Sequence, residues 1–270
     1  MNREISAFRL PRAIGLDLGN TLVQDTDKRY HTPRWREAIE RAIRLTNPDF
    51  CALTNEQWKM IEAHSFGQPQ VEAVRAIATA LGAEFGVAIK PEVLTAFATE
   101  ALQSMKPTGR ELTKGVASFL FKVKAAGVRL GVATSSDSAF ANWMLRGVGI
   151  ASFIDAVVGA DHPNIEGRYK PGPGPWEELW GALEVADTDT VLVIEDSFAA
   201  LLGAMASHSN VFGVLIAAKA ETKVAIRQVF AASASNHRIL CRPNFHGLAE
   251  RLVTKAQRRK TDAQSRPCIL

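Results

Sequence analysis

Residues 128–134 read VRLGVAT and residues 190–196 read TVLVIED, two short apolar runs that each end on polar side chains. A continuous apolar run of this length is typical of a β-strand that is buried on both faces of a sheet. Between and after these two runs, segments with apolar residues at helical spacing alternate with further apolar runs as far as residue 231. Alternation of strands with helices indicates a doubly wound parallel sheet, which binds its ligands at the carboxyl ends of the strands. We therefore predict an α/β fold.

The same pattern predicts the other strands and helices of this sheet. An earlier apolar run, AIGLDL at residues 13–18, predicts a first strand. Further strands are expected at residues 153–158 and 211–216, with a short edge strand at residues 238–241. The helices are expected at residues 115–126, 140–146, 175–184, 198–207 and 220–231.

A helical region is inserted after the first strand, between residues 32 and 107. Thr32 and Pro33 predict a helix start, because proline is favoured in the first helical turn. Thr54 and Gln57 have the spacing of a capping box, in which each side chain bonds the backbone of the other residue. Two more helices are expected at residues 70–81 and 91–105. With no strand pattern between them, these four helices indicate a separate all-helical lobe.

Composition limits the class of protein. The chain has 270 residues, of which 47% are hydrophobic and 22% are charged, so a mostly disordered chain is excluded. The three cysteines cannot all pair, which favours a reducing, cytoplasmic setting. The sequence shows no apolar run long enough for a membrane span, and the first fifteen residues lack the apolar core of a signal peptide.

The positive charge is concentrated at one end of the chain. The formal net charge is +4, yet the last twenty residues hold six basic side chains and only one acidic side chain. The rest of the chain is therefore nearly neutral and offers no basic face for nucleic acid. We expect a solvated, flexible tail over residues 254–270, with a weak anchor for phosphate or membrane lipid as the alternative.

Polar side chains follow four of the predicted strands. The carboxyl ends of parallel strands meet at one edge of a sheet, so these side chains should lie close together. Carboxylates hold Mg²⁺, a lysine and hydroxyls bind phosphate oxygens, and a carboxylate beside phosphorus can act as a covalent nucleophile. The combination favours phosphoryl chemistry. The groups in chain order are Asp17, Thr134 to Ser136, Lys170 in the loop YKPGPGPW, and Glu195 with Asp196.

These segments resemble the four motifs of the haloacid dehalogenase-like hydrolases. The matching stretches are DLGNTL at residues 17–22, ATSS at 133–136, the pair Lys170-Pro171, and VIEDS at 193–197. Their order is that of the family, and the resemblance covers roughly residues 13–250. The segment HTPRWREAIERAI at residues 31–43 is similar to the first cap helix of the beta-phosphoglucomutase-like subgroup.

The resemblance implies a Rossmann-like core with a helical cap of the first type. The core would comprise residues 1–26 and 108–253, and the cap would comprise residues 27–107. Only about ten residues separate the third predicted strand from Lys170, too few for the alternative cap insertion.

The resemblance also implies a role for each motif residue. Asp17 would be the nucleophile and a Mg²⁺ ligand, and Lys170 would offset the charge of Asp17 and of the phosphate. Thr134 and Ser135 would contact phosphate oxygens. Asp196, with Glu195, would bind Mg²⁺.

Gly19 departs from the family pattern. Phosphatases of the family carry a second aspartate there, which protonates the leaving group, and a glycine has no side chain for proton transfer. The Gly19 carbonyl could still be a Mg²⁺ ligand and the backbone could contact the substrate. A glycine disfavours a phosphomutase, and Lys59 and Lys90 have no recognisable context for a Schiff base.

Several other residues have a structural and a functional interpretation. His31 and His64 could replace the missing proton donor, although surface or capping roles are the favoured interpretations. Packing is favoured for Trp176 and Trp180, and a buried structural thiol is expected for Cys51. Loop and capping roles are expected for Asp137 and Asp161, with a place near the metal as the alternative for Asp161.

The sequence predicts a Mg²⁺-dependent phosphatase of a small phosphorylated metabolite, acting as a monomer or homodimer without nucleic acid. Two alternatives stay open: a catalytically weak phosphate-binding or interaction protein, and a hydrolase of a C–P or C–halogen bond.

Overall fold

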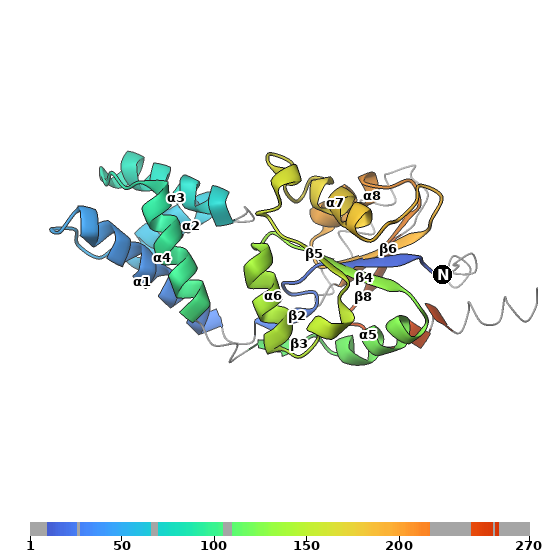
Figure 1. Cartoon of the computed structure of the whole chain (residues 1–270). Coiled ribbons are helices and arrows are strands. Elements are labelled where there is room, and N and C mark those ends of the chain that lie inside the picture. The colour runs from blue at the N-terminus through green and yellow to red at the C-terminus, as the bar shows by residue number, and fades with distance from the viewer. Residues whose placement is uncertain are drawn as a thin grey trace, which may run out of the picture.

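The protein consists of a sheet lobe and a helical lobe that lie side by side in Figure 1. The computed structural model describes residues 10–25, 28–65, 70–104, 110–216, 239–250 and 252–253. None of the helices in this part of the chain is long and apolar enough to cross a membrane.

A six-stranded sheet forms the centre of the first lobe, with the strand order β5-β4-β1-β6-β7-β8. Every neighbouring pair in this sheet is parallel. The predicted doubly wound α/β fold is therefore confirmed. The strands are β1 (Ala13–Leu16), β4 (Arg129–Ala133), β5 (Ala156–Val158), β6 (Val191–Glu195), β7 (Val211–Ile216) and β8 (Ile239–Arg242).

Strand β5 is shorter than the sequence predicts. Residues Ala151–Phe153 form the 3-10 helix η2 instead, and pairing with β4 begins only at Ala156, opposite Gly131. Asp155 lies between the two elements. Its carboxylate accepts a hydrogen bond from the backbone N–H of Leu130 at 2.8 Å. The apolar side chains of this run pack against the core but are mostly only partly buried, so the run predicted neither full burial nor strand length here.

Two apolar layers enclose the sheet. Side chains of β1 alternate between them, with Ile14 and Leu16 in one cluster and Ala13 in the other. Helices α5 (Val116–Ala125) and α6 (Ser138–Gly147) supply the first layer. Helices α7 (Gly174–Ala182) and α8 (Phe198–Ala206) supply the second layer, on the opposite side of the sheet in Figure 1. A short 3-10 helix, η3 (Pro163–Ile165), precedes α7.

The helical lobe has an apolar core of its own, which all four of its helices supply. Thr54 and Gln57 form the predicted capping box, since the Thr54 N–H donates to Gln57 Oε1 and the Gln57 N–H donates to Thr54 Oγ1. The first and third helices are longer than predicted. Pro33 lies inside the first helix instead of at its start, and the third helix continues beyond Leu81. The helices are α1 (Lys28–Thr46), α2 (Asn55–Ser65), α3 (Gln70–Phe85) and α4 (Pro91–Ser104).

A two-stranded antiparallel sheet borders the helical lobe, and the sequence did not predict it. Strand β2 (Val23–Asp25) leads toward the lobe and β3 (Arg110–Leu112) follows it. Each strand has only three residues, too few to show the alternation of apolar and polar side chains that marks a strand in a sequence. The helix expected at residues 220–231 and the tail at 254–270 lie outside the described residues, and the predicted division into core and cap stays a prediction.

Candidate active site

The site residues gather where β1, β4 and β6 end. Asp17 directly follows β1, and its N–H donates to the Ile194 carbonyl of β6 at 2.9 Å. Leu16 of β1 pairs in register with Ile194 of β6 and with Val132 of β4. The next residues along each strand therefore reach the same edge, which faces the helical lobe in Figure 1.

Lys170 lies between two of these carboxylates. Its Nζ is 2.8 Å from Asp17 Oδ1 and 3.1 Å from Glu195 Oε2. All three side chains are buried, with exposed fractions of 5% for Lys170, 11% for Asp17 and 3% for Glu195. The chain thus brings together groups separated by 153 and 25 positions in the sequence. These three side chains therefore lie close together, as the sequence predicts.

Asp196 completes a carboxylate cluster at this edge. Oxygen atoms of Asp17, Glu195 and Asp196 all lie within 4.8 Å of one another. Burial and the nearby Asp17 charge raise the pKa of Glu195 to about 8 and the pKa of Asp196 to about 6. For Lys170, burial lowers the pKa, but the charges of Asp17 and Glu195 outweigh it, so the pKa is raised. Three carboxylates lie near one ammonium here, so negative charge exceeds positive charge when all three carboxylates are ionised.

The donor set suits a hard divalent cation. Mg²⁺ prefers oxygen ligands, commonly one or two carboxylates together with waters. Burial and the Asp17 charge disfavour the ionised forms of Glu195 and Asp196 and raise their pKa values, an effect that Lys170 offsets only in part, so further positive charge would stabilise the ionised forms. A cation among these oxygens would supply that charge, so the residues fit a magnesium ion.

Thr134 and Ser135 occupy the neighbouring loop, directly after β4. Thr134 is buried, its N–H donates to the Val158 carbonyl at 3.0 Å, and its Oγ1 accepts the Ser136 N–H at 3.1 Å. Ser135 is half-buried. The hydroxyls therefore lie at the strand-end edge where Asp17 lies, as the sequence predicts for groups that bind phosphate oxygens.

Gly19 and Asn20 form the turn after Asp17. Gly19 is exposed, and a Cβ atom built on it would meet nothing within 4 Å. Asn20 has a φ of 55°, a left-handed conformation that asparagine tolerates better than most residues. Its side chain hydrogen-bonds Asp196, a contact that the sequence interpretation missed. The sequence sign of this turn was the pair Gly19-Asn20, because glycine and asparagine are both common in turns.

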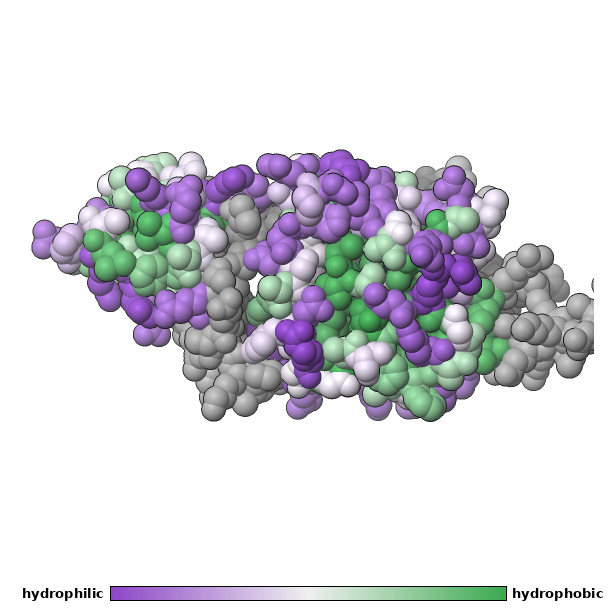
Figure 2. Space-filling view, viewed as in Figure 1, coloured by the Kyte–Doolittle hydropathy of each residue, from purple (hydrophilic) through white to green (hydrophobic). Residues whose placement is uncertain are grey.

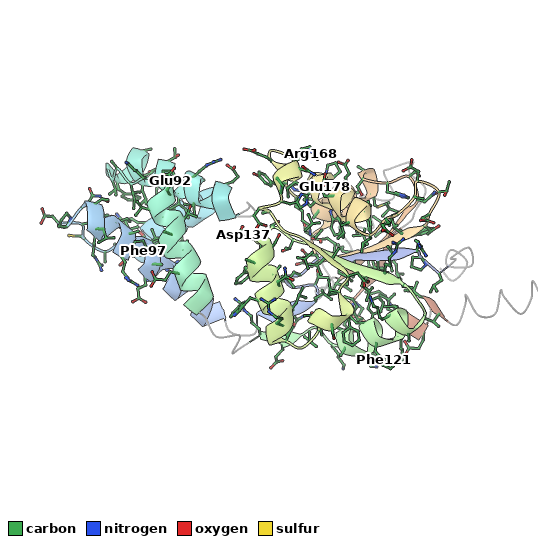
Figure 3. The ribbon with its side chains drawn as sticks, viewed as in Figure 1. Glu92, Phe97, Phe121, Asp137, Arg168 and Glu178 are labelled. Atoms are coloured by element: carbon green, nitrogen blue, oxygen red, sulfur yellow. The ribbon has the colours of Figure 1, made fainter. Side chains whose placement is uncertain are left out.

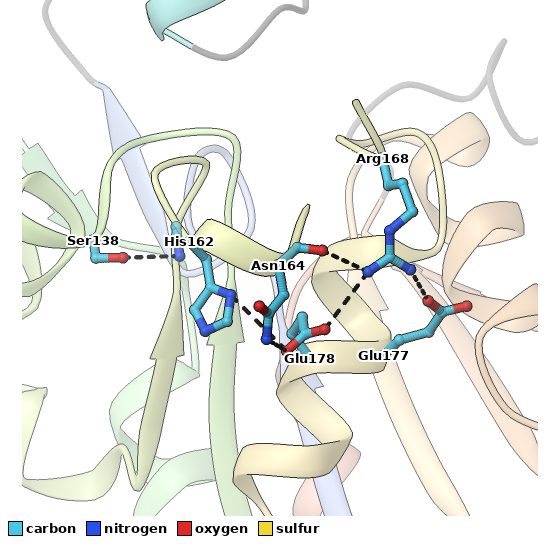
Figure 4. A network of polar contacts seen from close by, with 7 residues as sticks. Ser138, His162, Asn164, Arg168, Glu177 and Glu178 are labelled. Atoms are coloured by element: carbon cyan, nitrogen blue, oxygen red, sulfur yellow. Dashed lines mark hydrogen bonds and ion pairs between the residues drawn. The ribbon is translucent and has the colours of Figure 1, made fainter. Parts of the chain in front are cut away.

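A polar network links the loop that carries Lys170 to helix α7, and Figure 4 draws it. Arg168 donates to Glu177 Oε2 at 2.6 Å and to the Asn164 carbonyl at 2.6 Å. Asn164 also donates to Glu178 Oε2 at 3.1 Å. The surface above α7 is hydrophilic in Figure 2, and Figure 3 places Arg168 and Glu178 there. The sequence interpretation missed this network, although RYKPGPGPWEE places a cation near two acids.

The other candidates have mixed outcomes. Trp176 and Trp180 are 0% and 3% exposed, which confirms packing. Cys51 is exposed, so the expected buried thiol was wrong, because residues 51–54 form a surface connection between α1 and α2. The side chains of His31 and His64 lie outside the described part of the chain.

Asp161 has the predicted capping role. Its Oδ1 accepts both the N–H and the hydroxyl of Ser138, at 2.7 Å each, and so caps α6 from another loop. Asp137 lies at that end of α6 in Figure 3, but its side chain makes no capping hydrogen bond, so the capping role expected for it was wrong. Burial and the Asp161 charge raise its pKa.

Comparisons with known proteins agree with this geometry. The family model of the haloacid dehalogenase-like hydrolases matches residues 11–208. The phosphoglycolate phosphatase of Rhodospirillum rubrum is 35% identical over 89 residues, which are 33% of this chain and 35% of that protein. The chain thus matches about a third of the length of this relative.

Solved structures share the fold at low sequence identity. A haloacid dehalogenase-type phosphatase from Thermococcus onnurineus matches with a TM-score of 0.60 and 15% identity, over 90% of this chain and 98% of that chain. A Thermotoga maritima protein described as a beta-phosphoglucomutase matches with a TM-score of 0.56 and 18% identity, over 92% and 99% of the two chains.

Proposed function

The chain belongs to the haloacid dehalogenase-like hydrolases, and from this membership and the site we propose that it is a Mg²⁺-dependent phosphatase of small phosphorylated metabolites. One observation carries the proposal. The Lys170 ammonium is bonded to Asp17 and Glu195 while Asp196 completes a carboxylate cluster within 4.8 Å. These residues would supply a nucleophile, a fixed positive charge and a metal-binding donor set at one edge of the sheet.

In the proposed reaction, Asp17 is the nucleophile. A carboxylate oxygen of Asp17 attacks phosphorus, the bond from phosphorus to the ester oxygen breaks, and the leaving group departs with the bonding electron pair and takes up a proton. Water then attacks the phosphorus of the aspartyl-phosphate, which releases inorganic phosphate and regenerates the Asp17 carboxylate. Lys170, which is already bonded to Asp17 Oδ1, stabilises the negative charge that develops on the phosphoryl oxygens.

The residues that would hold magnesium are Asp17, Asp196, Glu195 and the carbonyl of Gly19. The ion would supply positive charge to the phosphoryl oxygens in the transition state. Glu195 also accepts a bond from Lys170, so it orients the ammonium in addition to contributing negative charge. Thr134 and Ser135 would donate hydrogen bonds to the phosphate from the loop after β4.

The helical lobe would act as a cap. We propose that residues 27–107 close over the strand-end edge, exclude water and select the substrate, as mobile lids do in other enzymes. This assignment is supported by the position of the lobe, which the strand-end edge faces in Figure 1.

A second candidate function rests on Gly19. Because no side chain at this position can transfer a proton, a weakly catalytic phosphate-binding protein would keep the same cluster. A pure binding protein has little use for a buried nucleophile beside a lysine, so hydrolysis is the better supported function.

Turnover of phosphate esters with and without metal tests the proposal. We expect release of inorganic phosphate from para-nitrophenyl phosphate in millimolar Mg²⁺ and loss of turnover in EDTA. A panel of sugar, nucleotide and acyl phosphates would then identify the substrate class. Binding of phosphate without turnover of any ester would favour the second candidate.

A further inference from the structure

Lys170 has a third partner besides its two carboxylates. Its Nζ lies 4.4 Å from the centre of the Trp176 ring. A lysine ammonium within about 6 Å of an indole centroid is attracted to the electron-rich face of the ring, and tryptophan gives the strongest contact of this kind. The ammonium is therefore held by Asp17 and Glu195 and also by an aromatic face.

Trp176 buries a polar N–H group that has no partner in the described part of the chain. Its side chain is fully buried, yet its Nε1 has no hydrogen-bond partner among the described residues. A buried donor without a partner destabilises the folded state, and phenylalanine would avoid this cost. Trp180, one turn further along α7, does use its N–H, which donates to Ser207 Oγ at 2.8 Å. The indole at position 176 thus offers a ring face and no hydrogen bond.

Strand β1 makes room for this ring. A Cβ atom on Gly15 would lie 2.7 Å from Trp180 Cη2, closer than side chains allow, and 3.0 Å from Trp176 Cζ3, a tight contact. Gly15 precedes Asp17 by two residues, so the strand that delivers Asp17 also lies against the ring under Lys170. The two indoles stack with centroids 6.4 Å apart, which fixes the plane of Trp176.

We infer that Trp176 is a positioning residue for Lys170, keeping the ammonium in place when the Asp17 carboxylate becomes bonded to phosphorus. This inference rests on the proposed function. When Asp17 forms the aspartyl-phosphate, the ion pair between Asp17 and Lys170 changes, because the attacking oxygen then carries a covalent bond. The Trp176 face does not change during the reaction, and it holds the ammonium against the phosphoryl oxygens throughout.

A double-mutant cycle tests the contact without any need for activity. We would measure the melting temperatures of Lys170→Met, Trp176→Leu and the double variant. A direct contact makes the effects non-additive, so the double variant should lose less than the sum of the single losses, by a few degrees. The matched cycle pairs Lys170→Met with Trp180→Leu, in the same helix, and should be additive. Additive effects in the Trp176 cycle would overturn the inference, and Trp176→Met, which also lacks a ring face, enters that cycle if Trp176→Leu does not fold.

Steady-state kinetics then separate positioning from packing. We expect Trp176→Leu to lower kcat by about 5- to 30-fold, the rate equivalent of a desolvated cation–π contact, with KM changed less than about twofold. Trp176→Phe, which keeps a ring face, should restore most of the loss. A Trp176→Leu variant with wild-type kcat and a lower melting temperature would show that Trp176 packs in the core but does not position Lys170. If the wild type hydrolyses no phosphate ester, the proposed function fails, while the thermal cycle still decides whether Trp176 holds Lys170.

Discussion

Asn20 bonds Asp196 through its side chain, across the ends of β1 and β6, while its own backbone is left-handed with a φ of 55°. One residue therefore shapes the turn after Asp17, the proposed nucleophile, and contacts a carboxylate of the proposed metal site. The Asn20 N–H also donates to the Val23 carbonyl at 2.8 Å, which closes the turn.

Asn20→Gly should separate these two roles. Glycine accepts the left-handed backbone, so we expect a nearly unchanged melting temperature without metal. Loss of a hydrogen bond to a charged group should weaken Mg²⁺ binding about tenfold, as measured by calorimetric titration. Asn20→Ala is the matched control, because it also loses the amide but adds backbone strain and should lower the melting temperature. Equal Mg²⁺ affinity in wild type and Asn20→Gly would contradict the role in orienting Asp196.

Gly203→Ala should disturb the loop that carries Lys170. A Cβ atom on Gly203 would lie 1.8 Å from the Pro171 carbonyl oxygen, so α8 and this loop would have to separate. We expect a melting temperature several degrees lower and at least a tenfold loss of kcat, measured on the same samples. Gly181→Ala in α7 is the control, since its Cβ meets nothing within 4 Å and alanine favours a helix. Wild-type kinetics in Gly203→Ala would show that the loop tolerates displacement.

Metal-free stability should fall as the pH rises. The pKa of Glu195 is raised from 4.5 to about 8, and the pKa of Asp196 from 3.8 to about 6, by burial and by the Asp17 charge. A carboxyl whose pKa is higher in the folded state holds its proton more tightly when folded. The extra stability of the folded state is complete when the pH is below the pKa of the carboxyl in the unfolded chain. It is lost as the pH rises through the pKa of the carboxyl in the folded state. In EDTA, the free energy of unfolding should therefore decrease between about pH 4 and pH 8.

Millimolar Mg²⁺ should reverse this loss, with the largest rise in melting temperature at the alkaline end. Asp196→Ala should abolish most of the rise. Asp187→Asn, an exposed carboxylate before β6 at the opposite end of that strand, should leave it unchanged. A melting temperature that does not respond to Mg²⁺ at any pH would refute the metal assignment.

Asp17→Asn should abolish turnover while keeping the shape of the side chain. Loss of the attacking carboxylate oxygen should lower kcat by roughly a thousandfold or more, as removal of covalent nucleophiles does. Phosphate release from para-nitrophenyl phosphate measures this, with circular dichroism to verify folding. Activity above a tenth of the wild-type value would rule out an aspartyl-phosphate at Asp17.

The positions of Asp17, Lys170, Glu195 and Asp196 at one edge could be predicted from sequence. Each follows or lies near the end of an apolar run, and parallel strands bring such ends together. The partners of these groups could not be predicted. Contact of Lys170 with Glu195 and with the Trp176 face depends on how the loop after β5 packs against α7, and no spacing encodes that packing.

The same limit explains the errors elsewhere. The pairing of β2 with β3 depends on a long-range contact between three-residue segments. Cys51 was expected inside because a buried thiol is the default for a cysteine, although it lies on a surface connection. Local capping, as at Thr54 and Gln57, was predictable because both partners lie within one turn.

Gly19→Asp tests whether the missing acid limits the reaction. The space beside Gly19 is open, with nothing within 4 Å of a built Cβ, and the left-handed residue of the turn is Asn20 rather than Gly19. An aspartate should therefore fold into this position. General acid catalysis contributes about 10²–10⁴-fold, and it matters most when the leaving group departs poorly without a proton.

We expect wild type to prefer para-nitrophenyl phosphate and acyl phosphates over a simple alkyl phosphate. Gly19→Asp should raise kcat/KM for the alkyl phosphate by at least about tenfold more than for para-nitrophenyl phosphate. Gly19→Asn is the matched control, because it fills the same space without a transferable proton and should leave the preference unchanged. If wild type already hydrolyses alkyl phosphates as readily as para-nitrophenyl phosphate, and a folded Gly19→Asp leaves that ratio unchanged, then another group supplies the proton. His31→Ala and His64→Ala would then show which, since the loss of the true donor should penalise only the poor leaving group.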